Sequence, residues 1–431
     1  MISKLAKVLE MYPRFYRIAI RIYGLRAFNP ARLHYRIGCR CISTTEISSK
    51  YELIFDAQCL QGLTRQRGIG TYSLSLIGAI CELEPNKKFA AYLTTIAKCR
   101  EIEIAMKELD ALNCPNLDVI VIDPFRNQSV RTLDFVQREI GSLLSKGTPK
   151  AIINMSNFEK PMNAIPTPKL LKSKSVGILY DLIPMHFPHE FLISNAQKST
   201  YFWQIKNLKD SELLLSISQR SMTNWKELVD SDSKVRVIYG AGRTNTKPDP
   251  IEDFQRTGIL CVGAEQSHKN LNRLMEAYSL LEIGIQDSNP LTIIGIRSKG
   301  MRKRLKVKAN QLRITLELPN YLPVDQLIHT YKSKRLLVVP SLEEGLSLPI
   351  LEAWSLGLPV VGSSNTAVEE ILQDSSLLFD PYSVKSIKET ISNILTQDFF
   401  WQRAVEEIPE KIEKFSWSQT ATLTLKAIEE I

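Results

Sequence analysis

The sequence predicts an α/β protein built from two doubly wound domains, and three observations support this. The chain has 431 residues, which is enough for two or three domains that each bury a core. Short apolar runs alternate with helical patterns from residue 51 onward, as in βαβ units. Residues 336–364 form one strand–loop–helix–strand unit whose strands are apolar enough to be buried on both faces of a parallel sheet.

This unit is the clearest element of the chain. Leu336 to Val339 is a short apolar and β-branched run, which predicts a buried strand. Pro349 fits the first position of the following helix, and Gly357 fits the residue after its end. Leu358 to Gly362 predicts the next strand.

Glu344 and Glu352 are the two carboxylates of this unit that point to a function. Glu344 falls on the loop and Glu352 on the first turn of the helix, so both face the carboxyl end of the sheet, where open α/β folds bind ligands. A carboxylate accepts hydrogen bonds from vicinal hydroxyls, and a helix start with free N–H groups suits a phosphate. A sugar nucleotide has both parts. The alternative is that neither residue binds a ligand: Glu344 is then a solvated loop residue, and Glu352 is an acid that stabilises the first turn of the helix.

Composition is that of an ordinary globular protein, with 44% hydrophobic and 23% charged residues. The seven cysteines are scattered and include no C-x-x-C pair, so neither a disulfide framework nor a zinc site is indicated. A reducing cytoplasm fits this usage.

The net charge of +9 is concentrated at the amino terminus. Residues 1–50 hold ten Lys and Arg against two Glu, which leaves the rest of the chain close to neutral and argues against a nucleic-acid surface. Within residues 1–45, basic side chains alternate with apolar ones at helical spacing, which suits a helix lying on anionic lipid. The alternative is a basic amphipathic extension packed on the body. No run is long enough to span a bilayer, and the segment lacks the uninterrupted apolar centre and the small-residue cleavage site that are expected of a signal peptide.

The first globular domain is predicted over residues 51–246. After the strand at 53–55, Gly68 and Gly70 lie in a predicted loop that leads into a helix over 73–83. Glycines let backbone N–H groups approach phosphate oxygens, although a tight turn is the simpler interpretation. Further strands of this domain are predicted at 89–92, 117–122, 151–153, 176–180, 213–216 and 235–239.

Two polar residues follow strands of this domain. Asp181 comes directly after the strand at 176–180, where it caps the next turn or faces a ligand. Ser218 precedes a helix predicted over 219–228, where it is the N-cap of that helix or contacts a ligand.

The second domain is predicted over 259–410, after a polar and proline-rich hinge at 247–258. Lys269 precedes a helix over 271–281, where a cation is unfavourable unless an anion is bound, so we expect it to neutralise a diphosphate. The cations between 302 and 313 are interpreted as a solvated helix face rather than a site for acidic substrates.

The block P-S-L-E-E-G-L-S-L-P-I-L-E-A-W-S-L-G-L-P-V-V closely resembles the E-x7-E signature of the retaining glycosyltransferases of family 4. The resemblance covers roughly residues 51–428. Tyr180 to Pro188 is similar to the family's H-D-L-I-P-x-x-x-P block, with Tyr180 in place of His, and Val262 to Asn270 is similar to V-G-x-x-x-P-R-K-N, with His268 in place of Arg.

The resemblance implies the GT-B fold, in which two Rossmann-like domains face each other across a cleft, here with the basic extension added at 1–50. It also implies a last helix, within 411–431, that crosses back to the first domain. The residues it implies for catalysis are Glu344 and Asp181; for donor binding, Lys269, Asn270, Gly345, Leu346, Ser347, Leu348, Glu352 and Gly263; and for lining the cleft, Gly68, Gly70 and Tyr180.

The expected function is a retaining transfer of a hexose, of mannose or rhamnose type, from a nucleotide-diphosphate sugar to a glycan or lipid-linked acceptor in polysaccharide biosynthesis. This mechanism requires no metal, so we expect no metal and no cofactor. The expected location is the cytoplasm, with peripheral contact to the inner face of the cell membrane. A sugar-nucleotide epimerase and a non-catalytic scaffold of the same fold are the alternatives.

Overall fold

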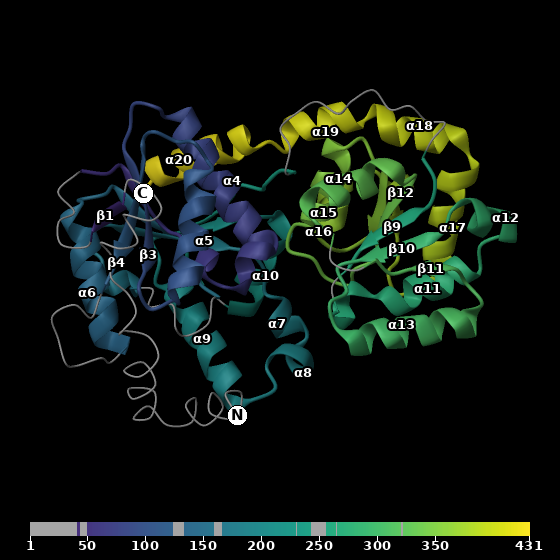
Figure 1. Cartoon of the computed structure of the whole chain (residues 1–431), viewed down its shortest axis with the longest axis horizontal. Helices are drawn as coiled ribbons and strands as arrows, with labels where there is room; N and C mark the ends of the chain where they lie inside the picture. Colours follow the sequence, from purple (N-terminus) through teal and green to yellow (C-terminus); the bar gives the residue numbers. More distant parts are fainter. Residues whose placement is uncertain are drawn as a thin grey trace.

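The computed structural model describes residues 41–43, 50–123, 133–158, 166–229, 231–242, 256–263, 265–319 and 322–431. The chain forms two α/β domains side by side, each with a parallel sheet and helices packed around it (Figure 1). The predicted fold class is therefore confirmed. Among the described residues, no helix is both long and apolar enough to cross a bilayer.

The sheet of the first domain has, within the described residues, eight parallel strands in the order β1-β4-β3-β2-β5-β6-β7-β8. The chain builds outward from β2 to β4 and then returns to build outward from β5 to β8, so the order reverses between β2 and β5. The strands are β1 (Cys41–Ser43), β2 (Leu53–Asp56), β3 (Phe89–Thr94), β4 (Leu117–Ile122), β5 (Ala151–Asn154), β6 (Lys174–Leu179), β7 (Leu213–Ser216) and β8 (Val235–Val237).

Strand β1 falls within the segment predicted as a basic extension, and it pairs with β4 at the edge of the sheet. Residues 1–40 and 44–49 of that extension lie outside the described ranges, as do 247–255 of the predicted hinge. The expected membrane contact through residues 1–45 therefore stays a prediction.

The helices of the first domain connect successive strands. They are η1 (Gln58–Gln61), η2 (Leu63–Gln66), α4 (Gly68–Leu83), α5 (Cys99–Asp110), α6 (Leu133–Lys146), η3 (Pro168–Leu170), α7 (Ile183–His186), α8 (Pro188–Phe191), α9 (Asn195–Lys209) and α10 (Gln219–Val229).

The predicted glycine loop before α4 is wrong. Gly68 to Gly70 form the first turn of α4, and the preceding loop is two short 3-10 helices. A Cβ at Gly70 would overlap the backbone of Arg65, so glycine allows η2 to pack against the helix start. The glycines thus serve close packing of the backbone here.

The second sheet has, within the described residues, six parallel strands in the order β11-β10-β9-β12-β13-β14, and its order reverses between β9 and β12. The strands are β9 (Ile259–Val262), β10 (Leu291–Ile294), β11 (Leu316–Glu317), β12 (Leu336–Val339), β13 (Val360–Ser363) and β14 (Leu378–Phe379). The helices are η5 (Ser267–Lys269), α11 (Leu271–Ser279), α12 (Ile283–Ser288), α13 (Lys299–Leu312), α14 (Val324–Ser333), α15 (Leu348–Ser355), α16 (Ala367–Leu372), η6 (Ser375–Leu377), α17 (Val384–Thr396), α18 (Asp398–Glu406), α19 (Ile408–Lys414) and α20 (Trp417–Glu429).

The unit around β12 and α15 follows its sequence pattern. All four residues of β12 are buried, as expected for a strand covered on both faces. Helix α15 begins at Leu348, one residue before Pro349. It ends before Gly357, which has a positive φ of 69°, the backbone region that glycine adopts most easily.

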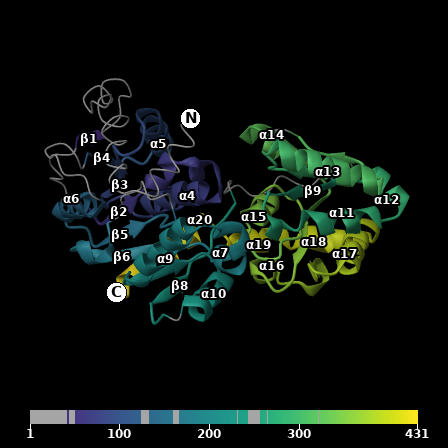
Figure 2. The same cartoon turned by 90° about the horizontal axis from the view of Figure 1, so that it is seen from below.

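Helix α20 returns to the first domain and lies against α4 in Figure 1. The ring of Trp417, at the start of α20, packs edge-on against Tyr72 of α4 with 5.1 Å between centroids. The Trp417 Nε1–H donates to the carbonyl of Gly242 at 2.9 Å. The two domains are also in contact where α10 meets α16, which both views show (Figure 2).

Candidate active site

The candidate site lies where the chain order of the second sheet reverses, at the loops that follow β9 and β12. Ligands of open α/β sheets bind at such a point, outside the carboxyl ends of the strands. The loop after β12, residues 340–347, carries Glu344, and the loop after β9 carries Lys269.

Glu344 and Lys269 form a mostly buried ion pair. The Lys269 Nζ donates to Glu344 Oε1 at 2.6 Å, and the hydroxyl of Ser341 donates to the same oxygen at 2.6 Å. Burial raises the pKa of the Glu344 carboxyl, but the charge and hydrogen bond of Lys269 outweigh burial and hold that pKa below its usual value. Among the described residues, no donor reaches Oε2 of Glu344, so this oxygen can accept a ligand hydroxyl.

The backbone after Glu344 supplies unused donors. The N–H groups of Gly345, Leu346, Ser347 and Leu348 donate to no atom of the described residues. Ser347 has a left-handed backbone (φ 62°) just before α15, and its buried hydroxyl also lacks a partner within the described chain. Buried N–H and O–H groups are nearly always bonded, so this turn is suited to bind an anion.

Glu352 lies one turn further along α15 and is 8% exposed. The hydroxyl of Tyr331, on α14, donates to Glu352 Oε2 at 3.0 Å, which fixes the carboxylate. The sequence analysis missed Tyr331 because it lies 21 residues from Glu352, without a local pattern that links the two.

Asp181 faces this site from the first domain, at the end of β6. Its Oδ1 accepts the N–H of Ile183 at 3.0 Å, so it caps the following turn. Burial raises the pKa of Asp181 to about 6, and the nearby negative charge of Glu344 also raises it. Gly345 packs against this strand end, because a Cβ there would lie 2.9 Å from the carbonyl oxygen of Tyr180.

Two other cleft candidates behave differently. The Tyr180 side chain is 6% exposed and lies in the first domain's core, where its hydroxyl donates to the carbonyl of Met155 at 2.9 Å. The backbone of Tyr180, however, approaches the second domain at Gly345. Gly68, in contrast, lies against the side chain of Leu348 across the cleft, with 3.1 Å from a Cβ position to Cδ1.

Asn270 and Gly263 lie beside the site, where both donate hydrogen bonds to backbone carbonyls. Asn270 Nδ2 donates to the carbonyls of Pro340 (3.0 Å) and Pro381 (2.7 Å), so it ties together the loops after β12 and β14. Gly263 follows β9, and its N–H donates to the carbonyl of Ile294 at 2.9 Å.

Two further glutamates of the second domain bind the first domain. Glu343 accepts two hydrogen bonds from the Arg220 guanidinium, at 2.9 and 2.8 Å, and a third from Asn224 at 3.3 Å. Glu370 accepts the N–H groups of Gln219 and Arg220, at 2.6 and 3.0 Å, and thereby caps α10 from the opposite domain. Ser218 caps the same helix locally, since it accepts the N–H of Ser221 at 2.9 Å, which confirms its interpretation as an N-cap.

His268 of the second domain contacts two aromatic rings of the first domain. Its ring lies 5.6 Å from Phe187 and 5.9 Å from Phe191, measured between centroids. Burial, together with the charge of Lys269, lowers the pKa of His268 to about 4, so the imidazole is neutral at physiological pH. Beside it, the N–H of Ser267 donates to Glu190 at 3.2 Å.

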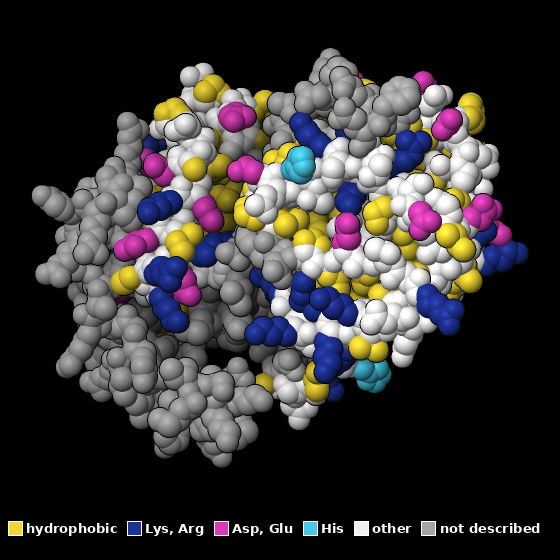
Figure 3. All heavy atoms as spheres, turned by 45° about the vertical axis from the view of Figure 1, so that its right-hand side comes forward, with side chains coloured by type: hydrophobic (Ala, Val, Ile, Leu, Met, Phe, Trp, Pro, Cys, Tyr) yellow, Lys and Arg dark blue, Asp and Glu magenta, His cyan; other side chains and the backbone are white. Residues whose placement is uncertain are grey.

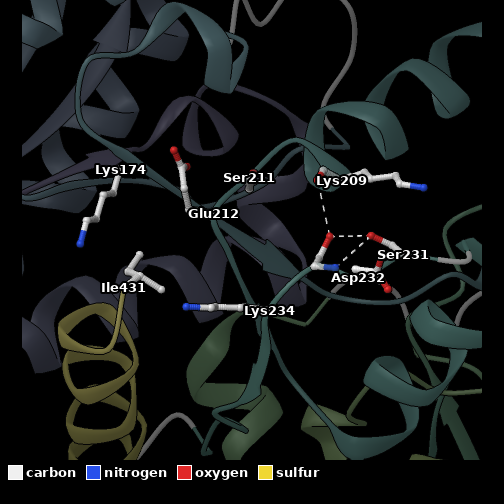
Figure 4. Close-up of a pocket in the computed structure, with 9 residues that line it drawn as sticks. Lys174, Lys209, Ser211, Glu212, Ser231, Asp232, Lys234 and Ile431 are labelled. Carbon is white, nitrogen blue, oxygen red and sulfur yellow. Dashed lines mark hydrogen bonds between the residues drawn. The ribbon is translucent and has the colours of Figure 1, made fainter.

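A pocket of about 530 Å³ lies elsewhere, at the amino ends of β6, β7 and β8 (Figure 4). Its lysines do not converge, since Lys209 points away from Lys174 and Lys234 in Figure 4, and Glu212 and Asp232 offset their charge. Within the described chain, no three His, Cys, Asp or Glu side chains are grouped to hold a metal ion. The expectation of a reaction without a metal stays a prediction.

Comparison with curated proteins gives relatives at low identity. The serotype-specific mannosyltransferase WbdA of Escherichia coli is 23% identical over 406 residues, which cover 87% of this chain and 47% of WbdA. The O-antigen chain mannosyltransferase B of Escherichia coli is 32% identical over 170 residues, which cover 39% of this chain and 44% of the relative. The chain thus spans about half the length of these relatives.

Solved structures show the fold. The crystal structure of Anabaena HepE in complex with UDP and glucose superposes with a TM-score of 0.65 at 15% identity, covering 88% of this chain and 99% of HepE. The model of the family "Glycosyl transferases group 1" matches residues 243–414, which include both loops of the candidate site. The second domain is thus similar to the glycosyl transferases group 1, and the chain has the GT-B fold.

Proposed function

We propose that this protein is a retaining glycosyltransferase that moves a hexose from a nucleotide-diphosphate sugar to a glycan or lipid-linked acceptor. One observation carries the proposal: the four successive N–H groups of Gly345 to Leu348, which have no acceptor among the described residues, lie between the buried carboxylates Glu344 and Glu352. A diphosphate needs such donors, and a sugar and a ribose need such acceptors.

Each part of the site then has a role in donor binding. The N–H groups and the Ser347 hydroxyl hold the diphosphate, and Glu352, fixed by Tyr331, accepts the ribose hydroxyls. Glu344 Oε1 is occupied by Lys269 and Ser341, so Oε2 accepts a hydroxyl of the sugar. The Lys269 ammonium has three N–H donors and gives one to Glu344, which leaves donors for a phosphate oxygen.

The reaction breaks the bond between the anomeric carbon and the β-phosphate oxygen. Both electrons of that bond go to the diphosphate, whose growing charge is stabilised by the N–H groups and Lys269. The acceptor oxygen attacks from the face that the diphosphate leaves, and its proton goes to the departing phosphate, so the configuration is retained. Asp181, when ionised, accepts a hydrogen bond from the acceptor hydroxyl and orients it.

The sugar that we propose is of mannose type, since WbdA and the O-antigen chain mannosyltransferase B are both named mannosyltransferases. The place of the reaction in polysaccharide biosynthesis is proposed on the same ground, because one relative is named for the O-antigen chain. HepE is described in complex with UDP and glucose, which supports the nucleotide-sugar class of donor.

The test is a thermal-shift and hydrolysis screen of GDP-, UDP-, dTDP- and ADP-sugars with the wild type, Glu352→Gln and Glu389→Gln. Glu389 is the matched control, since it lies on α17 with its side chain 54% exposed. We expect one donor to raise the melting temperature and to be slowly hydrolysed, with both effects weakened only in Glu352→Gln. Binding without turnover would favour a non-catalytic scaffold, and no binding by folded protein would contradict the donor site.

A further inference from the structure

Helix α9 carries large apolar side chains on its outer face. Phe202 is 51% exposed and Trp203 36% exposed, and Ile193, just before the helix, is 70% exposed. Exposed aromatic rings are costly in water and are typical of surfaces that bind a partner or a membrane interface. The outer face of α9, defined here as Lys198, Phe202, Trp203, Lys206 and Lys209, therefore needs a partner.

The same face is basic. Lys198, Lys206 and Lys209 are exposed and lie four residues before, and four and seven residues after, Phe202, so they surround its ring on one side of the helix. No Asp or Glu occurs between residues 191 and 209. Aromatic rings among lysines, without a carboxylate, are the pattern of a helix that lies in an anionic membrane interface.

The outer aromatic rings are not needed to hold α9 in place. The inner face buries Tyr201, Ile205 and Leu208 against the first domain, in one cluster with Leu179 of β6 and Trp225 of α10. Ser194 and Gln197 close the helix start with reciprocal hydrogen bonds. Helix α9 is thus fixed to the domain by one face while its other face presents Phe202 and Trp203.

Charge decides which partner fits. Residues 1–50 carry ten cations against two carboxylates, so this part of the chain is repelled by the lysines of α9. A second copy of the chain that packed symmetrically on this face would bring lysine against lysine. An anionic bilayer attracts the three lysines and accepts the rings in its interface.

We propose that the outer face of α9 docks on an anionic membrane surface, with the rings of Phe202 and Trp203 in the headgroup region. Helix α9 follows α7 and α8, and both Phe187, between these two helices, and Phe191, at the end of α8, contact His268 beside the candidate site. Docking there holds the acceptor side of the cleft close to the lipid surface. The docking itself is independent of the proposed function.

Helix α13 is the matched comparison on the other domain. It carries six cations and no carboxylate, and Figure 3 shows Lys and Arg side chains gathered on the lower part of the second domain. Its one large exposed apolar side chain is Val307, at 48%, and it has no aromatic residue. We expect α13 to attract anions without inserting into a bilayer.

The experiment uses the fluorescence of Trp203. Of the five tryptophans, the other four are at most 3% exposed, and none lies before residue 203. The full chain is mixed with vesicles of phosphatidylglycerol and phosphatidylcholine, or of phosphatidylcholine alone, with some acyl chains brominated as quenchers. We expect a blue shift and quenching with the anionic vesicles only, and loss of both in Trp203→Phe, which still sediments with them.

Variants then identify the contacts. Lys198→Gln/Lys206→Gln/Lys209→Gln should lower the partition coefficient by about fivefold per lysine, and Phe202→Ser/Trp203→Ser should lower it further. The matched controls, Lys299→Gln/Lys303→Gln/Lys306→Gln on α13 and Phe399→Ser on α18, should retain quenching of Trp203.

Vesicle binding without a change in Trp203 emission would assign the contact to residues 1–45 or to α13 and overturn the proposal. The absence of binding to anionic vesicles would overturn it as well. Donor binding, measured on the same samples without lipid, tests the proposed function separately.

Discussion

Glu343 and Glu344 are neighbours in the chain and have opposite surroundings. Both oxygens of Glu343 accept hydrogen bonds from Arg220 of the first domain, so this carboxylate is saturated by the protein. Glu344 uses one oxygen for Lys269 and Ser341, and its other oxygen accepts from no described donor. The difference teaches that unused hydrogen-bonding capacity, rather than residue type or burial, separates a ligand-binding acid from a structural one.

The second pair of glutamates differs in position. Both carboxylate oxygens of Glu370 accept hydrogen bonds from N–H groups at the start of α10, and these bonds join the two domains. Glu352 accepts a hydrogen bond from Tyr331 and borders the turn whose N–H groups have no acceptor in the described part of the chain. We therefore expect mutation of Glu344 and Glu352 to affect the reaction, and mutation of Glu343 and Glu370 to affect how the domains are held.

The largest effect is expected for Glu344→Gln. The change removes the charge that faces the transferred sugar and that orients Lys269 toward the diphosphate. Loss of one such electrostatic contact lowers kcat by about a hundredfold to a thousandfold. Steady-state transfer with the donor from the screen measures it, and Glu343→Gln is the control. Equal losses in both variants would contradict the comparison.

A smaller effect is expected for Glu352→Gln, because it weakens binding of the ribose without changing the reacting atoms. Loss of a hydrogen bond to a charged group raises KM for the donor by about tenfold to a hundredfold, while kcat stays close to the wild-type value. Titration calorimetry with the nucleoside diphosphate alone checks the same point. An unchanged affinity for the nucleotide would remove Glu352 from the ribose.

The third prediction is a pH dependence. The Asp181 carboxyl must be ionised to accept a hydrogen bond from the hydroxyl of the acceptor substrate. Burial raises the pKa of Asp181 to about 6. The ionised fraction falls as the pH falls through this value, so the transfer rate at pH 5 should be about tenfold below its plateau above pH 7. Asp181→Asn should be slow and lose this step. A step that persists in Asp181→Asn would assign it to another group.

The smallest effect is expected for the contact between the domains. Arg220 is one-third exposed, so the surrounding water weakens its pairing with Glu343. A double-mutant cycle with Arg220→Gln and Glu343→Gln should give a coupling of about 1 kcal/mol in the free energy of unfolding. Affinity for the nucleotide should be unchanged in all three variants. Zero coupling would mean that the ion pair does not stabilise the closed arrangement.

The parts of the fold that were predictable have local causes. The strand at 336–339, the helix near Pro349 and its end at Gly357 follow from apolar pattern and backbone preference. The start of α4 did not follow, because Gly68 to Gly70 indicated a loop. Only the packing of η2 against Gly70, a tertiary contact, shows why glycines occur within a helical turn.

For the candidate site, the sequence predicted which residues lie near one another but could not predict their individual contacts. The sequence placed Glu344, Glu352 and Lys269 near one crevice, since strand ends of a parallel sheet share an edge. It could not pair Glu343 with Arg220, 123 residues away, or direct the Tyr180 side chain into the core.

Hydrogen exchange of the peptide at 341–351, with and without the nucleotide sugar, tests the central claim most directly. The N–H groups of Gly345 to Leu348 have no acceptor among the described residues, so a bound diphosphate should slow their exchange. The account predicts this protection in the wild type and in Glu343→Gln, and its loss in Glu352→Gln at the same donor concentration. Donor binding that leaves this peptide unchanged and protects another part of the chain would contradict it.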